Sequence, residues 1–192
     1  LIMASIYKTP DWMTQTLADL VRHEGFREWA YPDPLSSLFK KYKKERWGFV
    51  PAMSILEKLG VSLSEADKTG APWTIGIGFT KGVTVNSQMK LNVAMHKLEG
   101  IVLDHLPVLD KVLPGWQNLP LFAKTVVVNM AFNMGSRLLQ FKNSMSLIGQ
   151  GNYKQAASNL RKSAWAKQVG QRAVELTARL ERQAIDPKHR VV

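Results

Sequence analysis

The chain has 192 residues, of which 45% are apolar, a formal net charge of +11 and no cysteine. The length suits one domain with or without an insertion, and the apolar fraction is enough to fill a core, which argues against a disordered chain. Without cysteine there are no disulfides, thiolate metal sites or cysteine nucleophiles, and the four histidines lack the short spacings of a zinc site, so we expect neither metal nor cofactor. The positive charge indicates a polyanionic partner, either nucleic acid or the phosphate-rich envelope of a bacterium.

Targeting signals are not evident in the sequence. No uninterrupted apolar run approaches the roughly 20 residues that a membrane span needs. The first ten residues lack the apolar core of a signal peptide. We therefore expect the protein to remain in the cytoplasm in which it is made.

The N-terminal region predicts one helix followed by a rigid turn. Thr9 offers a hydroxyl N-cap and Pro10 suits the first helical position. Gly25 is a suitable C-terminal stop, and Pro32-Asp33-Pro34 predicts a stiff non-helical turn. The apolar stripe of this helix has helical spacing and consists of Met13, Leu17, Leu20 and Val21.

Residues 35–72 differ in character from the rest, and we interpret them as an insertion within a single domain of residues 1–192. The segment has a basic run from Lys40 to Arg46, a short predicted helix from Pro51 to Leu59 that Gly60 closes, and a loop-like end. The basic run has two interpretations: contact with an anionic bacterial envelope, or a solvated charged surface.

The remaining segments show strand and then helical periods. From Trp73 to Phe79 apolar residues alternate with small or polar ones, as in a half-buried strand. A helical pattern begins at Asn86, and Pro107 is expected to interrupt it near its end. The later predicted helices are Leu121–Met134 (apolar nearly all round and therefore buried), Tyr153–Arg161 and Val169–Ala184. The helix that begins at Asn86 has an apolar stripe of Leu91, Met95, Leu98 and Val102. The stripe of the last helix consists of Val169, Ala173, Leu176 and Leu180.

Glu24 is the first candidate catalytic residue. Counted at about 100° per residue from Met13, it falls in the middle of the apolar stripe. It also lies in the last helical turn, where the backbone dipole disfavours negative charge. Partial burial and the dipole would both raise the pKa of this carboxyl, as a general acid requires. The alternative is a structural glutamate that pairs with Arg22 or Arg27.

Asp33 and Thr74 complete the candidate constellation. Asp33, in a turn held by two prolines, should be exposed and ionised. A shielded carboxyl at a helix end and an ionised one on a rigid loop match the two roles in glycoside hydrolysis. Thr74 lies on the strand face of Gly76 and Gly78, where a ligand can approach the backbone and the hydroxyl can hold a water or a sugar. The alternative for each residue taken alone is a structural one: Asp33 is an ordinary turn aspartate, and Thr74 is a threonine that favours a β-strand.

Several short motifs follow one another along the chain. They are Glu24-Gly25, Tyr31-x-Asp33, Thr74-Ile75-Gly76-Ile77-Gly78, Asn129-Met130-Ala131-Phe132-Asn133-Met134-Gly135, Phe141-Lys142-Asn143-Ser144, Ala156-Ala157-x-Asn159-Leu160, Ser163-x-Trp165 and Gln171-Arg172-Ala173. Together they resemble the phage-type lysozymes, the T-even phage endolysin family of glycoside hydrolase family 24. The resemblance covers most of the chain outside residues 35–72, in family order.

The resemblance implies a mainly helical α+β lysozyme-like fold, with a small strand-containing N-terminal lobe facing a helical C-terminal lobe across a cleft. It implies hydrolysis of the β-1,4 bond between N-acetylmuramic acid and N-acetylglucosamine in peptidoglycan. Glu24 matches the general acid that protonates the leaving oxygen, Asp33 the second carboxylate, and Thr74 the threonine that helps to place the attacking water. Family members of this type invert the anomeric carbon; carboxyls about 6.5–9.5 Å apart would fit inversion, and about 5–5.5 Å a covalent intermediate.

Further positions carry over from the family. Phe132, Ser144 and Asn159 match residues that line the sugar cleft. The alternative interpretations are that Phe132 is a core residue and that Ser144 and Asn159 are capping or surface residues. Arg172 matches an arginine that pairs with the catalytic glutamate, and it would lower the pKa of Glu24, against the shift argued above. We interpret Trp165 as a packing residue.

Two features depart from the family pattern. Phe79 stands where the family usually has histidine, so the stabilising ion pair of that histidine is missing. The second departure is the segment 35–72, where relatives have a short hairpin. The mechanism requires that this insertion leave Thr74 beside Asp33.

Two other functions stay open. A lytic transglycosylase would cut the same bond with one catalytic acid, tolerate Asp33→Asn better than Glu24→Gln, and release an anhydro-sugar. A non-catalytic wall- or nucleic-acid-binding module would use the basic charge, although no helix-turn-helix, zinc-finger or RNA-binding motif supports nucleic acid. In the favoured interpretation the protein is a monomer that lyses the host late in phage infection. It waits in the host cytoplasm until a holin gives it access to the peptidoglycan glycan strands.

Overall fold

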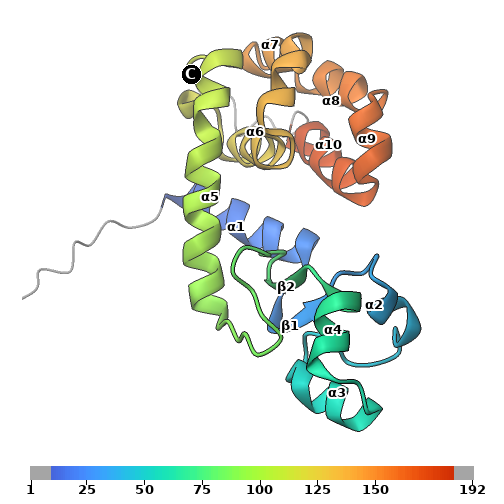
Figure 1. Cartoon of the computed structure of the whole chain (residues 1–192). Helices are drawn as coiled ribbons and strands as arrows, with labels where there is room; N and C mark the ends of the chain where they lie inside the picture. The colour runs from blue at the N-terminus through green and yellow to red at the C-terminus, as the bar shows by residue number, and fades with distance from the viewer. Residues whose placement is uncertain (1–9, 184–192) are drawn as a thin grey trace, which may run out of the picture. The chain divides into compact units, whose positions relative to one another are not determined.

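A computed structural model describes residues 10–183 of the chain (Figure 1). The described residues are mainly α-helical and contain a two-stranded antiparallel sheet, so the predicted α+β, mainly α class is confirmed. The chain divides into two compact units. We call Leu20–Leu98 the strand-containing unit, and the residues up to Asp19 together with those from Glu99 onward the helical unit.

Helix α1 (Asp11–Glu24) begins and ends close to the predicted positions. The Pro10 carbonyl accepts hydrogen bonds from the N–H groups three and four residues further along, at 2.9 and 3.1 Å. Gly25 has φ +75°, the left-handed conformation that terminates a helix, and its N–H donates to the Val21 carbonyl. The predicted N-cap, Thr9, lies outside the described residues.

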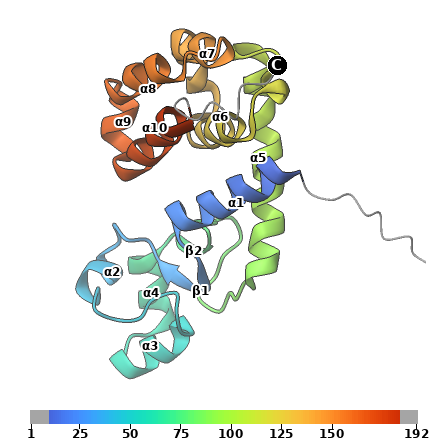
Figure 2. The ribbon, with the colours of Figure 1, turned by 180° about the vertical axis from the view of Figure 1, so that it is seen from behind.

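The helical unit is built around α6 (Leu121–Met134), which is buried nearly all round, as predicted. The segments before and after it are η1 (Trp116–Asn118), η2 (Gly135–Phe141), α7 (Lys142–Gly149), α8 (Tyr153–Arg161), α9 (Ala164–Val169) and α10 (Gln171–Gln183). Helix α10 packs against α6, α8 and α9, and α8 also packs against α7 (Figure 2). The predicted bounds of α8 are confirmed.

Helix α10 begins later than the sequence pattern predicts. The predicted first residue, Val169, ends α9 instead, and Gly170 with φ +54° separates the two helices. The predicted end at Ala184 lies outside the described residues. The buried stripe is present at Ala173, Leu176 and Leu180.

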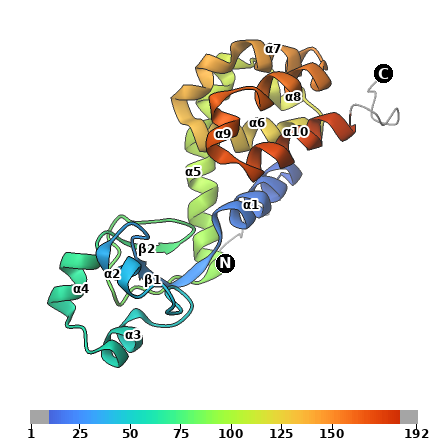
Figure 3. The same ribbon diagram turned by 90° about the vertical axis from the view of Figure 1, so that its right-hand side faces the viewer.

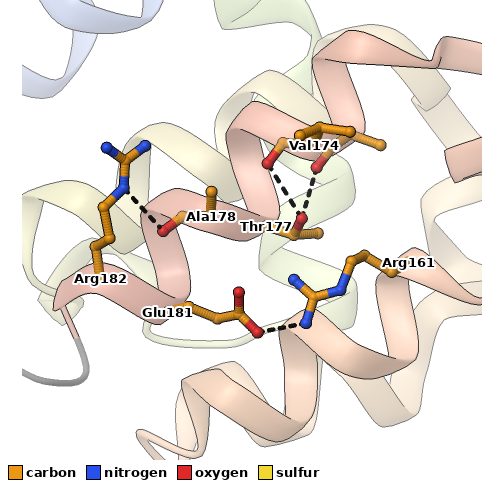
Figure 4. Close-up of polar contacts among 7 residues, drawn as sticks. Arg161, Val174, Thr177, Ala178, Glu181 and Arg182 are labelled. Atoms are coloured by element: carbon orange, nitrogen blue, oxygen red, sulfur yellow. Dashed lines mark hydrogen bonds and ion pairs between the residues drawn. The ribbon is translucent and has the colours of Figure 1, made fainter.

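Ion pairs hold α10 to its neighbours in the helical unit. Arg179 donates to Asp19 Oδ2 at 2.6 Å and to Thr125 Oγ1 at 2.9 Å, which joins α10 to α1 and α6. The arginine and aspartate side chains are only 20% and 10% exposed. At the surface, Arg161 of α8 pairs with Glu181 of α10 (Figure 4).

The sheet pairs β1 (Arg27–Pro32) with β2 (Trp73–Gly76). In the antiparallel register Tyr31 lies opposite Thr74, and the ladder is irregular between Arg27 and Tyr31. All four residues of β2 are buried, so this strand is covered on both faces and not half-buried as predicted. Strand β2 therefore lies in the interior of the strand-containing unit.

The strand predicted to reach Phe79 is wrong at its C-terminal end, because the chain turns back after β2. Gly76 and Gly78 have φ +67° and +89°, conformations that favour glycine. Ile75 and Phe79 then exchange two backbone hydrogen bonds, of 2.8 and 2.9 Å, across the turn. The apolar alternation along this segment arises from a tight turn and not from one continuous strand.

Helix α5 (Leu91–Val112) starts later than Asn86, where the pattern predicted it. Residues 87–89 instead form backbone hydrogen bonds with β1. Pro107 lies inside the helix, which continues past it, so the predicted interruption is wrong. Leu91 is 47% exposed, and the predicted stripe is fully buried only at Leu98 and Val102.

The insertion forms three short helices: α2 (Ser37–Lys41), α3 (Ala52–Leu59) and α4 (Leu63–Gly70). The prediction of α3, closed by a left-handed Gly60, is confirmed. The prediction of a loop over α4 is wrong, because the Ser62 hydroxyl accepts the Glu65 N–H at 3.2 Å and caps a helix there.

The insertion shares one hydrophobic core with the sheet. The helices of the insertion are drawn in Figure 3 together with β1 and β2. Helix α2 packs against α4, and α3 packs against β1. The segment is therefore part of the interior of the strand-containing unit. The buried members of this core are Ala30, Leu38, Trp47, Ala52, Ile55, Leu56, Val61, Ala66, Trp73 and Val85.

Candidate active site

Glu24 is the last residue of α1, directly before the Gly25 turn. Its side chain is exposed, so the predicted position within the buried stripe is wrong. Leu17 and Leu20 of the same helical face are buried, but the helix ends one turn later. Helical periodicity gives the direction of a side chain and does not give what covers it at the end of the element. Glu24 is thus presented at the surface on a well-defined helix terminus.

Asp33 follows the last residue of β1 and lies in the predicted non-helical turn. Its backbone N–H donates to the Gly70 carbonyl at 3.0 Å, and its own carbonyl accepts the Ser36 N–H at 2.8 Å. Its Oδ1 accepts the Leu35 N–H at 2.6 Å. These bonds fix both the main chain and the carboxylate, which remains half-exposed.

The two ends of the insertion meet beside Asp33. The bond from Asp33 to Gly70 joins the chain just before the insertion to the C-terminal end of the insertion, and the Ser37 hydroxyl donates to the Thr69 carbonyl at 3.3 Å. Gly70 lies so close to its neighbours that an added Cβ would be 2.8 Å from Leu38 Cδ2 and 3.1 Å from Pro32 Cβ. The insertion therefore closes on itself and returns the chain to β2 next to the start of the segment.

Thr74 lies in β2, directly opposite Tyr31 of β1, and is 8% exposed. Directly opposed residues in an antiparallel pair point to the same face, with Cβ atoms about 5 Å apart. The two neighbouring glycines differ from what the sequence suggested. An added Cβ at Gly76 would be 2.9 Å from the side chains of Met89 and Phe79. The space beside Gly76 is therefore filled by these two side chains and is not open to a ligand. Gly78 has open space around it.

Tyr31 is a residue whose position beside the candidate site was not predicted from the sequence. Its side chain is half-buried, and this burial is the main cause that raises the pKa of the phenol. The Arg27 guanidinium lowers the pKa of Tyr31 in part, whereas the carboxylates of Asp33 and Glu24 raise it. In the chain Tyr31 lies two residues before Asp33, and in the sheet it is paired with Thr74. The signal in the sequence was its spacing of two residues from Asp33.

The strand-containing unit thus holds Glu24, Asp33 and Thr74, whereas the other candidates lie in the helical unit. Phe132 of α6 is half-buried, with its ring centroid 5.9 Å from that of His105. Ser144 of α7 is buried, and Asn159 of α8 is exposed. Arg172, near the start of α10, is 8% exposed.

A family model of known proteins matches this chain. The model is that of phage lysozyme, and it matches residues 57–183. The chain belongs to the phage lysozyme family. A search of curated proteins found no match. Phage lysozymes are peptidoglycan-degrading enzymes of the glycosidase type, so peptidoglycan is the substrate of this family member. The matched region includes Thr74 and the candidates of the helical unit, and it begins after Glu24 and Asp33.

Trp165 of this phage lysozyme has the packing position that the sequence suggested. It is 5% exposed, its Nε1 donates to Asn133 Oδ1 at 2.8 Å, and its ring meets Phe141 edge to face. The phenylalanine that replaces the usual histidine of the family is also packed. Phe79 is 8% exposed, and Lys97 Nζ lies 4.4 Å from its ring centroid. A cation–π contact therefore occupies this position.

The basic run of the insertion forms an exposed surface on this phage lysozyme. All five of its cations are exposed, and Glu45 between them pairs with Lys58 at 2.9 Å. Phe49, 55% exposed, follows the run and stacks under Arg27 at 4.2 Å. We name Lys40, Lys41, Lys43, Lys44 and Arg46 the basic face.

Residues 10–183 contain no group of three or more His, Asp or Glu arranged to hold a metal ion. Within the same range, no helix combines the length and the apolar character needed to cross a bilayer.

Proposed function

We propose that this phage lysozyme is an endolysin that hydrolyses the β-1,4 bond between N-acetylmuramic acid and N-acetylglucosamine. The observation that carries the proposal is the gathering of Glu24, Asp33 and Thr74 in one compact unit, despite the insertion between them. The β1–β2 register brings Thr74 opposite Tyr31, two residues before Asp33. A carboxyl at a helix end and a second carboxylate on a fixed turn supply the two groups that glycoside hydrolysis needs.

The proposed reaction inverts the anomeric carbon. Asp33 takes a proton from a water that Thr74 helps to place, and the water oxygen forms a bond to the anomeric carbon. The glycosidic C–O bond breaks as Glu24 gives its proton to the leaving oxygen. Because Glu24 is exposed in the free protein, the glycan that covers it would exclude water and strengthen the electrostatic interactions at the site.

Residues of the helical unit would bind the glycan and support the acid. We assign sugar contacts to Phe132, Ser144 and Asn159. The half-exposed ring of Phe132 and the exposed amide of Asn159 support this assignment, whereas buried Ser144 could offer only its hydroxyl. Arg172 would pair with Glu24, as the family resemblance implies.

The basic face would hold the enzyme on the anionic envelope. Five exposed cations within seven residues attract a polyanion over a range set by the salt concentration. Lys43→Glu/Lys44→Glu should then weaken sedimentation with cell-wall preparations at low salt while leaving hydrolysis of small soluble fragments unchanged. Equal sedimentation of the variant and the wild type would remove this role.

In the cell, the proposed role is bacteriolytic: a monomeric enzyme lyses the host at the end of phage infection. It would reach the wall from the cytoplasm through a holin. Nucleic acid has no part in this role.

Clearing of purified peptidoglycan tests the proposed function. Wild type should release reducing sugars, and Glu24→Gln and Asp33→Asn should each lower the rate about 100-fold or more, because each removes one of the two proton transfers. The mass of the products separates the alternatives, since a hydrolase adds one water and a lytic transglycosylase releases an anhydro-sugar. An anhydro product, or an Asp33→Asn variant of full activity, would overturn hydrolysis.

A further inference from the structure

The face of the sheet that carries Thr74 also carries a phenol. Tyr31 and Thr74 are directly opposed in the β1–β2 ladder, so their side chains point to the same side with Cβ atoms about 5 Å apart. Thr74 is 8% exposed and Tyr31 is half-buried, so both side chains are held by their surroundings. Each strand thus contributes one hydroxyl-bearing side chain to the same face of the sheet.

Both candidate catalytic carboxylates act on that phenol. Asp33 comes two residues after Tyr31 in the chain, and Glu24 ends the helix that leads into β1. Each of the two negative charges disfavours loss of the phenolic proton, and the burial of the ring acts in the same direction. Since the pKa is raised from an ordinary value of 10.0, Tyr31 is a neutral phenol near pH 7. A neutral phenol can donate one hydrogen bond and accept another.

The surroundings of Tyr31 set it apart from the other half-buried phenol with a raised pKa. Burial alone raises the pKa of Tyr153, whose ring packs edge to face against Phe122 at 5.0 Å. No carboxylate contributes to that shift. Tyr153 therefore provides a matched comparison in the helical unit: the same side chain, similarly buried, without acidic neighbours.

We propose that Tyr31 is a positioning residue of the hydrolytic reaction, whose hydroxyl orients the attacking water together with Thr74 and in front of Asp33. This inference rests on the proposed function. A water that donates its reacting proton to Asp33 must keep its oxygen lone pair directed at the anomeric carbon. Two hydroxyl groups on one strand face restrict its rotation, and such restriction lowers the entropy lost on reaching the transition state. Tyr31 itself exchanges no proton with the sugar.

Tyr31→Phe removes the hydroxyl and keeps the ring that fills the half-buried position. With soluble peptidoglycan fragments we expect kcat to fall about 10- to 100-fold. KM should change less than about twofold, because the hydroxyl acts on water and not on sugar binding. The melting temperature should stay close to that of the wild type. Tyr153→Phe is the control, and its kcat should match the wild type.

A double variant separates positioning from a general structural effect. If Tyr31 and Thr74 orient the same water, Tyr31→Phe/Thr74→Ala should lose little more activity than the more damaging single variant. Additive losses, a change confined to KM, or an equal loss in Tyr153→Phe would each overturn the proposal.

The outcome also distinguishes this inference from the proposed function. A wild-type enzyme that releases no sugar product would refute the function, and the inference with it. An active wild type that Glu24→Gln inactivates, with Tyr31→Phe fully active, would refute the role of Tyr31 alone.

Discussion

Arg179 in the helical unit of this phage lysozyme and Asp33 in its strand-containing unit are held by different means. In the helical unit, Arg179 is 20% exposed and pairs with Asp19, which is 10% exposed, and it also donates to Thr125, so that one guanidinium joins three helices. In the strand-containing unit, the Asp33 carboxylate accepts the Leu35 N–H and the residue remains half-exposed. In the first arrangement the charge of Arg179 is paired with Asp19 inside the packed helices. In the second, the Asp33 carboxylate is fixed in orientation and remains accessible to a ligand. The comparison distinguishes a charge that is held in an ion pair inside the protein from a charge that a ligand can reach.

The largest expected effect is the loss of the buried pair of the helical unit. Arg179→Met leaves the Asp19 carboxylate in a buried position without its arginine. Removing one partner of a buried ion pair costs about 3 kcal/mol or more. In a chain of this size such a loss lowers the melting temperature by about 6 to 12 °C. Urea or thermal unfolding measures the change.

Arg182→Met is the matched control for that variant. Arg182 lies on the same helix and is exposed, with a long bond of 3.4 Å to the Ala178 carbonyl (Figure 4). Its replacement should change stability by less than about 0.5 kcal/mol. Equal losses in the two variants would show that α10 does not depend on the buried pair, and the contrast drawn above would not hold.

The second prediction concerns a glycine that positions Asp33. Gly70→Ala would push against Leu38 and the rigid Pro32, and the carbonyl of residue 70 accepts the Asp33 N–H. We expect destabilisation by about 1 kcal/mol. We also expect a fall in kcat of about threefold to tenfold, because a small displacement of a catalytic group is enough to slow the reaction. Unfolding and sugar release measure the two effects.

Gly100→Ala is the counterpart in the helical unit. Gly100 lies inside α5, is exposed, and has no atom within 4 Å of an added Cβ. Alanine should stabilise this helix by up to about 1 kcal/mol and leave kcat unchanged. Should Gly70→Ala also stabilise the protein at full activity, the insertion would not be what holds Asp33.

The helical unit was largely predictable from the sequence, because its elements follow local rules. Helices α6 and α8 have the predicted bounds, and α1 ends at the glycine that the sequence marked. The start of α10 was misplaced because the apolar period continues through Gly170, where the chain changes direction. The α4 helix was missed although Ser62 and Glu65 have the spacing of a capping box, so the signal was present.

The surroundings of the candidate site residues could not be predicted from the sequence. The motifs indicated Glu24, Asp33 and Thr74, and they lie in one unit. The exposure of Glu24 depends on where its helix ends, which periodicity does not give. The pairing of Tyr31 with Thr74 depends on a register across the insertion, and no local pattern encodes a contact between strands so far apart in the chain.

The smallest expected effect is that of the surface ion pair between Arg161 and Glu181, which is more exposed than the pair between Arg179 and Asp19. Arg161 and Glu181 are 43% and 35% exposed, and the hydrogen bond from Arg161 is the main cause that lowers the pKa of Glu181 (Figure 4). Solvent screening limits the contribution of such a pair to stability to at most about 0.5 kcal/mol, which Glu181→Gln should remove at pH 7.

Because the folded pKa of Glu181 is lowered, the contribution of the pair to stability is present above the unfolded pKa, near 4.5, and is lost as the pH falls through the lower folded value. The unfolding free energies of wild type and variant should therefore converge in acid, and also at 1 M salt at pH 7, where screening shortens to about 3 Å. A difference that grows on acidification would contradict the assignment, since it would require the carboxyl to be favoured in its protonated form.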